Sequence, residues 1–182
     1  MRRLLVCTAL LAAAGTVFAQ GGGQAGSKPA PASPPETATG TVGGKSVTIS
    51  YSSPRVKGRE GKVFGADGLI AKAGGSQYPI WRAGANKATT LTTGGDLMLG
   101  DLQVPAGTYT LFVDITDADN WTLIVNKKTG EWGLAHDPAQ DLGKVKMTMS
   151  KPASMVENLT WTVGDGKLTV AWENKSGSVA AH

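Results

Sequence analysis

The chain has 182 residues, with 18 Lys and Arg against 14 Asp and Glu and a formal net charge of +4. No block of five or more basic residues occurs, so the sequence gives no support to a nucleic-acid partner. The one cysteine, Cys7, excludes an internal disulfide and a metal site built from several thiolates, and the length suits a single domain behind a leader.

The first 19 residues have the pattern of a cleavable signal peptide. Two arginines precede an uncharged stretch, residues 4–17, and small or apolar residues stand at the −3 and −1 positions of a cut after Ala19. This stretch is shorter than the roughly 20 residues of a membrane span; an uncleaved anchor helix is the alternative. We therefore expect a periplasmic or secreted protein with no membrane span after cleavage. Cleavage removes Cys7 and two of the 18 basic residues, and 16 remain against 14 acidic ones, a net charge of +2.

Residues 20–36 consist mainly of Gly, Gln, Ala, Ser and Pro. Such a segment buries too little apolar surface to offset its ordering entropy, so it is predicted to be a disordered tether; a Pro-rich recognition ligand is the alternative. The domain itself is predicted over residues 37–179. Residues 180–182 are predicted to be a disordered tail.

The periodicity of residues 37–179 is that of β-strands. Gly43-Gly44 separates two β-prone stretches, as in a two-residue hairpin, and a helix is expected for one turn at most, within residues 64–73. About eight or nine short strands at hairpin spacing predict an all-β fold, a single antiparallel β-sandwich; a barrel is the alternative. Alternating apolar and polar residues are clearest in residues 108–115, 121–125, 145–149, 159–163 and 168–172.

The chain resembles the domain of unknown function 2911 family in several strings that occur in the expected order. They are ISYSSPRVKGR (49–59), IWRAGANKATT (80–90), VPAGTYTL (104–111), WTLIVN (121–126), EWG (131–133) and LTVAWEN (168–174). The resemblance implies an exported bacterial β-domain and assigns no activity and no catalytic residue. Residues 66–78 depart from it, because the corresponding connection in the family is shorter.

The connection over residues 52–86 is the candidate functional segment, because a long irregular loop in a compact domain is often functional. Arg presents a planar fork to a carboxylate or phosphate, and Trp presents a face to a sugar or cation. The segment is predicted to bind an anionic or sugar-like small molecule. The alternative is a structural clamp, in which Arg82 satisfies loop carbonyls, Trp81 closes the end of the sandwich and Gly84 allows a tight turn. The candidate ligand-binding residues are Arg55, Lys57, Arg59, Trp81, Arg82 and Asn86.

Three other groups of residues have side chains that could form a site. His136 with Asp137 and Asp141 lacks the spacing of a zinc site, and residues 114–120 have no glycine at the turn position of a calcium loop. Trp81 and Trp132 would form a sugar-stacking platform if both were exposed. We therefore predict no metal site, no catalytic residue and no cofactor.

These observations favour a non-enzymatic binding or accessory module of the cell envelope. Two alternatives remain open: a hydrolase acting on an envelope or extracellular sugar or peptide, and a purely structural envelope component. The balance leans away from an enzyme, since no catalytic constellation can be paired from the sequence. The sequence leaves the oligomeric state open.

Overall fold

The computed structural model describes residues 31–73, 76–130, 132 and 136–182. The predicted signal peptide (residues 1–19) and most of the predicted tether (residues 20–30) lie outside the described residues. In the described part, the chain is built from antiparallel sheets with two short helical turns, so the predicted all-β antiparallel sandwich is confirmed. No helix among these residues is long and apolar enough to cross a membrane.

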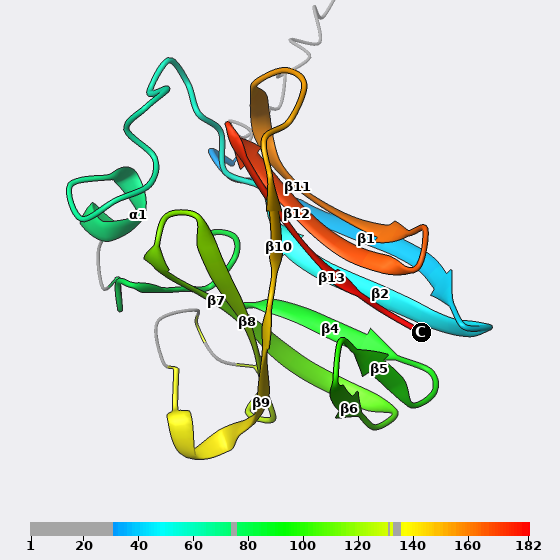
Figure 1. Ribbon diagram of the computed structural model, residues 1–182. Coiled ribbons are helices and arrows are strands. Elements are labelled where there is room, and N and C mark those ends of the chain that lie inside the picture. The colour runs from blue at the N-terminus through cyan, green and yellow to red at the C-terminus, as the bar shows by residue number, and fades with distance from the viewer. Residues whose placement is uncertain (1–30, 74–75, 131, 133–135) are drawn as a thin grey trace, which may run out of the picture.

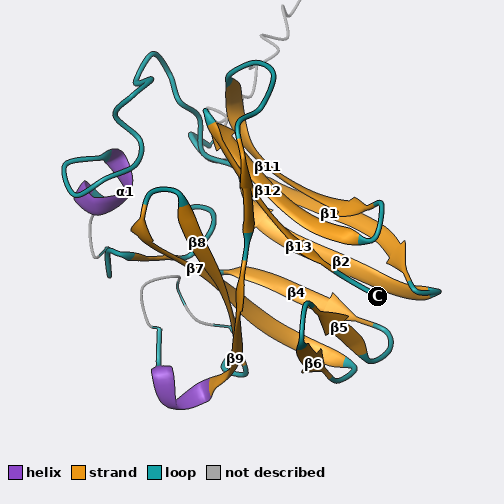
Figure 2. Cartoon of the chain, viewed as in Figure 1, coloured by secondary structure: helices purple, strands orange, loops and turns teal. Residues whose placement is uncertain are grey.

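Seven strands form the larger sheet (Figures 1 and 2). A two-residue turn joins its first two strands: Gly43 (φ 54°) and Gly44 (φ 78°) take the left-handed conformation that a two-residue hairpin requires, as predicted. In spatial order the strands are β1 (Pro35–Val42), β2 (Lys45–Ser52), β4 (Thr89–Thr93), β7 (Gly107–Asp117), β8 (Asn120–Asn126) and β9 (Asp141–Lys146), with β3 (Ile80–Trp81) paired to β7.

Four strands form the second sheet, which packs across the first. Its order is β10 (Thr148–Ser150), β13 (Lys175–Ala180), β12 (Lys167–Glu173) and β11 (Val156–Gly164). β9 and β10 are one run of backbone interrupted at Met147, whose N–H donates to the Trp121 carbonyl at 2.9 Å. This run pairs with β8 in one sheet and with β13 in the other, so it joins the two layers along one side (Figure 1).

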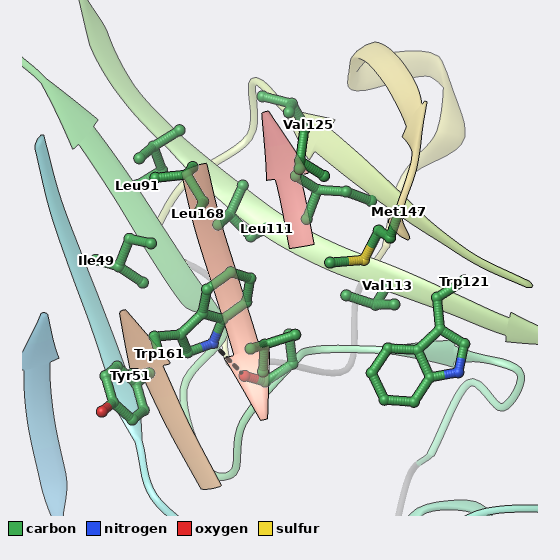
Figure 3. Close-up of a cluster of buried hydrophobic side chains, with 14 of the residues drawn as sticks. Ile49, Tyr51, Leu91, Leu111, Val113, Trp121, Val125, Met147, Trp161 and Leu168 are labelled. Atoms are coloured by element: carbon green, nitrogen blue, oxygen red, sulfur yellow. Dashed lines mark hydrogen bonds between the residues drawn. The ribbon is translucent and has the colours of Figure 1, made fainter. Parts of the chain in front are cut away.

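The opposite side of the sandwich closes where β1 meets β11 without a hydrogen-bonded ladder. A Cβ atom on Gly40 would lie 2.6 Å from the Val163 carbonyl oxygen, so the two backbones approach as closely as only glycine permits. Alternate residues of both sheets point between the layers and form the core, including Ile49, Leu111 and Trp161 (Figure 3). Trp121, Trp161 and Trp172, expected in the core, are 1%, 2% and 2% exposed.

The structure has thirteen strands in its described residues, where the sequence predicts eight or nine. The additional ones are short. The hairpin of β5 (Leu97–Leu99) and β6 (Leu102–Val104) covers one end of the sandwich, and β3 has only two residues. The single turn of helix expected within residues 64–73 is α1 (Leu69–Lys72), and a 3₁₀ turn occupies Pro138–Gln140.

The domain is longer at both ends than predicted. β1 starts at Pro35, inside the segment expected to be a tether, because the Ser53 N–H donates to the Pro34 carbonyl and Pro35 pairs with Ser52. The expected disordered tail is ordered instead: Ala181 is 3% exposed. His182 exchanges two backbone hydrogen bonds with Met98, at 2.8 and 3.1 Å. These contacts join residues far apart in the chain, so the sequence of the tail alone does not predict them.

Candidate functional site

The connection between β2 and β4 folds over the end of the sandwich away from β5 and β6, where α1 also lies (Figure 1). It encloses a cavity of about 310 Å³, here called the Arg82 cavity. Ala32 and Ser33, just before β1, also line it. Ligand sites in proteins are commonly concave and of roughly 300–1,000 Å³, so this space is large enough for a small molecule.

Five of the six predicted site residues line this one cavity. Asn86, the sixth, does not line it. Its backbone carbonyl accepts from Arg82 Nη1 at 3.1 Å and its side chain donates to the Ser33 carbonyl at 3.2 Å, so it supports the wall from behind. The five that line the cavity are Arg55, Lys57, Arg59, Trp81 and Arg82.

Much of the lining of the cavity is apolar. Its apolar floor consists of Leu69, Ile70, Ile80, Trp81 and Trp172. Trp81 comes from the larger sheet and Trp172 from the smaller one, and their rings stack with centroids 6.0 Å apart and planes 18° apart. Phe64 packs edge-on against both, at 5.9 and 6.0 Å. The floor is therefore continuous with the aromatic part of the core, which gives it a fixed shape.

Backbone pairing holds Trp81 in place. β3 pairs Trp81 with Val113 of β7, and the Ile115 N–H donates to the Pro79 carbonyl at 3.1 Å. The chain then turns sharply: Ala83 has a φ of 51°, and a Cβ on Gly84 would lie 2.9 Å from Thr89 Oγ1. The clamp alternative is thus correct for Trp81, which is 3% exposed, and for Gly84.

Two of the arginines donate hydrogen bonds from their guanidinium groups to other groups of the protein. Arg59 donates from Nε to the Val56 carbonyl and from Nη2 to the Arg55 carbonyl, both at 2.8 Å. Arg55 donates to Ser53 Oγ at 3.2 Å and forms an ion pair with Glu36 at 3.7 Å. Arg59 therefore holds its own loop, and Arg55 has Glu36 as an ion-pair partner.

Arg82 is the arginine whose guanidinium N–H groups are mostly without a hydrogen-bond partner among the described residues. A guanidinium has five N–H donors, and among the described residues that of Arg82 makes one hydrogen bond and no ion pair. The side chain is half-buried, and this burial lowers the pKa of the Arg82 guanidinium below its ordinary value. Removing a cation from water without a counter-ion is costly, so an anion at this position would be stabilising.

The charge of the lining has one sign. Its described residues include four cations, Arg55, Lys57, Arg59 and Arg82, and no Asp or Glu. Lys57 is exposed, and its backbone N–H, rather than its ammonium group, is bonded to Glu157. A concave site lined by one sign of charge over apolar walls concentrates ligands of the opposite sign. The arrangement suits an anion and disfavours a cation.

Asn86 supports the wall through an unusual backbone conformation, with a φ of 58°. Asn tolerates this left-handed region, glycine adopts it freely, and alanine adopts it only at an energetic cost. We expect Asn86→Ala to lower the free energy of unfolding by about 1 kcal/mol and Asn86→Gly to lower it by less than about 0.5 kcal/mol. Urea denaturation of both variants checks this. An equal loss in the two would mean that the side-chain bond to Ser33, rather than the backbone, is what matters.

The sugar-stacking platform requires both Trp81 and Trp132 to be exposed, and only one of them is. Trp132 is 60% exposed, but Trp81 is buried in the aromatic cluster and has no open face. The carbonyl-clamp role expected of Arg82 is correct for one of its donors only.

His136 lies elsewhere, on the outer face of the larger sheet. Its Nε2 is 2.9 Å from Asp141 Oδ1, which also accepts from Asn126 Nδ2 at 2.8 Å. Asp137 instead accepts from the Ala139 N–H and begins the 3₁₀ turn. No group of three or more His, Cys, Asp or Glu side chains suited to a metal occurs in the described ranges.

Sequence reasoning missed the floor. Trp172 was expected only in the core, because it alternates in phase with its apolar neighbours; it belongs to the core and also lines the cavity. Leu69 and Ile70 are an adjacent apolar pair in an otherwise Gly-rich and polar loop, and that contrast is a signal that could have identified them. Ser33 carried no signal, because its position depends on where β1 begins.

A comparison with family models matches residues 33–180 to one described as "Protein of unknown function (DUF2911)". No curated protein and no solved structure matches the chain. The match covers the whole sandwich and every candidate residue of the Arg82 cavity, in agreement with the resemblance of the sequence strings. The chain therefore belongs to the family of proteins of unknown function DUF2911.

Proposed function

We propose that the protein is a non-enzymatic binding module that holds a small anion in the Arg82 cavity. The observation that carries this proposal is the half-buried Arg82 guanidinium, which has no ion-pair partner among the described residues and lies in a lining without carboxylates. A charge-assisted hydrogen bond from such a group is about twice as strong as a neutral one. A sugar-like ligand is less well supported, because Trp81 offers no open ring face.

We place this module outside the cytoplasm, in the periplasm or the medium, as an accessory protein of the cell envelope. The support is the signal-peptide pattern of residues 1–19 and the low-complexity segment that follows it. A chain that loses its only cysteine with the leader is also suited to an oxidising compartment.

A thermal-shift screen of the purified protein tests the binding. The probes are acetate, phenylacetate and inorganic phosphate, with glucose as the neutral compound. At a hundredfold excess over Kd, a ligand that binds only the native state adds about 2.7 kcal/mol of stability. For a protein of this size we expect that to raise Tm by roughly 5–10 °C.

Substitutions locate the site. We expect Arg82→Gln to weaken the binding of any anion that gives a shift by roughly ten- to hundredfold, because it removes a charge-assisted bond worth about 1.5–3 kcal/mol. Lys167→Gln removes the same charge from an exposed residue of β12 outside the cavity and is expected to leave the affinity unchanged. No shift with any anion would contradict the proposal and favour the purely structural alternative. Turnover of a probe ester would favour the hydrolase.

A further inference from the structure

Lys57 is a second cation of the Arg82 cavity whose charged group is uncommitted. It lines the cavity and is exposed, and its ammonium group makes no hydrogen bond and no ion pair among the described residues. Its backbone has a φ of 50° and donates its N–H to Glu157 Oε1 at 2.9 Å. The cavity therefore has two uncommitted cations, the half-buried Arg82 and the exposed Lys57.

The balance of charge around the cavity indicates the charge of its ligand. Two carboxylates are bonded to residues of the lining, although neither lines the cavity itself. Glu36 forms the ion pair with Arg55 at 3.7 Å, and Glu157 accepts from the Lys57 backbone. When both are set against the four cations of the lining, two positive charges remain without a counter-charge. A ligand that carries two negative charges restores the balance, and the partly desolvated site strengthens its attraction.

The apolar part of the lining argues against a bare inorganic ion. Leu69, Ala73 and Ile80 are half-buried and line the cavity, and an inorganic ion would leave their apolar surface in contact with water. An apolar ligand body gains from contact with such side chains in proportion to the area removed from water. A volume of about 310 Å³ accommodates on the order of ten non-hydrogen atoms, at about 30 Å³ for each. The cavity therefore suits a small organic molecule.

We propose that the ligand is an organic dianion, a small molecule with an apolar body and two negative charges, one balanced by Arg82 and the other by Lys57. A dicarboxylate carries its charges on two groups, and a phosphomonoester carries both on one group with three terminal oxygens. The oxygens of either accept hydrogen bonds from a guanidinium fork and from an ammonium group. This inference rests on the proposed function, and it adds the charge of the anion and a second binding residue, Lys57.

Isothermal titration calorimetry of the full protein at about pH 8, where a phosphomonoester is a dianion, tests the charge of the ligand with two matched pairs. Adipate and hexanoate share a carbon chain and differ by one carboxylate. Phenyl phosphate and its methyl ester share a ring and differ by one negative charge. We expect the dianion of at least one pair to bind about fivefold or more tightly than its monoanion. The pair with the larger ratio shows whether the two charges belong to a dicarboxylate or to a phosphomonoester.

Inorganic phosphate tests the apolar body. It carries the charge of phenyl phosphate and lacks the ring. We expect it to bind at least about tenfold more weakly than the tighter of the two organic dianions, because it leaves the apolar part of the lining uncovered. These comparisons use the unmodified protein and so do not depend on how any variant folds.

Two matched substitutions test the role of Lys57. Lys57→Gln removes the cation and keeps the backbone N–H that is bonded to Glu157. We expect it to weaken binding of the tighter dianion about three- to tenfold and to change binding of the matching monoanion by less than about twofold, since Arg82 balances the charge that the two share. Lys62→Gln removes the same charge from an exposed residue of the same connection outside the lining and is expected to change neither. Melting curves show that each variant is folded before titration.

The outcomes separate this inference from the proposed function. If hexanoate and the methyl ester bind as tightly as adipate and phenyl phosphate, and Arg82→Gln abolishes that binding, the anion site stands and the dianion is wrong. If inorganic phosphate binds as tightly as both organic dianions, the apolar body is wrong. If Lys57→Gln weakens dianion and monoanion equally, or neither, the assignment of Lys57 is overturned. If no anion binds, the proposed function and this inference both fail.

Discussion

Trp161→Ala is expected to lower the free energy of unfolding by about 3–5 kcal/mol, the usual cost of emptying a buried aromatic position. Trp161 is 2% exposed and packs between the sheets beside Ile49 and Leu168 (Figure 3). It also contacts the connection between β2 and β4, because its Nε1–H donates to the Ala83 carbonyl at 2.9 Å. Urea denaturation followed by circular dichroism measures the loss.

Two variants divide this effect into its parts. Trp161→Phe keeps most of the ring and removes only the N–H. It is expected to cost about 1 kcal/mol, since the Ala83 carbonyl still accepts from Thr89 Oγ1. Trp132→Ala makes the corresponding truncation at a residue that is 60% exposed and is expected to change stability by less than about 0.5 kcal/mol. A loss below about 1 kcal/mol for Trp161→Ala would contradict the packing described here.

Gly40→Val is expected to destabilise the protein by about 1–3 kcal/mol, although valine is a better strand former than glycine. The new Cβ would lie 2.6 Å from the Val163 carbonyl oxygen and 2.8 Å from Val163 Cγ1. The first of these atoms belongs to the backbone of β11, which cannot turn aside as a side chain can. The closure between β1 and β11 must therefore open.

Thr41→Val is the matched control for this variant. It introduces the same side chain one residue along the same strand, at an exposed position. Its expected effect is within about 0.5 kcal/mol, and thermal melts of both variants give the comparison. A Gly40→Val protein as stable as the unmodified one would show that β1 and β11 are not in close contact.

Features encoded by a few adjacent residues could be predicted from the sequence. Gly43-Gly44 and the turn after β11, where Asp165 (φ 51°) and Gly166 (φ 65°) are left-handed, both have residues that favour such turns. The alternation that places Trp121 and Trp161 in the core is equally local. Only the larger strands and their hairpins follow from signals of this kind.

The rest depends on contacts between distant segments. The sequence does not predict β13, because Lys175–Ala180 consists mainly of small residues and has no clear alternation of apolar and polar side chains. These residues are buried only because β12 and β10 pair with the strand on either side. The order of the final residues comes from Met98, more than 80 positions away. Tertiary pairing overrides weak local preference at such places.

The site shows the same division at the level of single side chains. Arg59 and Arg82 are indistinguishable by type, and both were expected to bind ligand. The fold directs Arg59 to the Val56 and Arg55 carbonyls and leaves most donors of Arg82 uncommitted. Which arginine is available depends on which carbonyls the backbone brings within reach, and that is a property of the assembled loop.

The backbone segment that continues from β9 into β10 contributes a strand to each sheet. This continuity affects how the domain unfolds. Residues 141–146 pair with β8 in the larger sheet and residues 148–150 pair with β13 in the smaller one, so an edge strand of each sheet is continuous in the backbone with an edge strand of the other. An intermediate with one sheet intact would have to break this segment at Met147 and expose the Trp121 carbonyl to which it is bonded. Unfolding of the sandwich is accordingly expected as a single cooperative step, with no half-folded species accumulating at the midpoint.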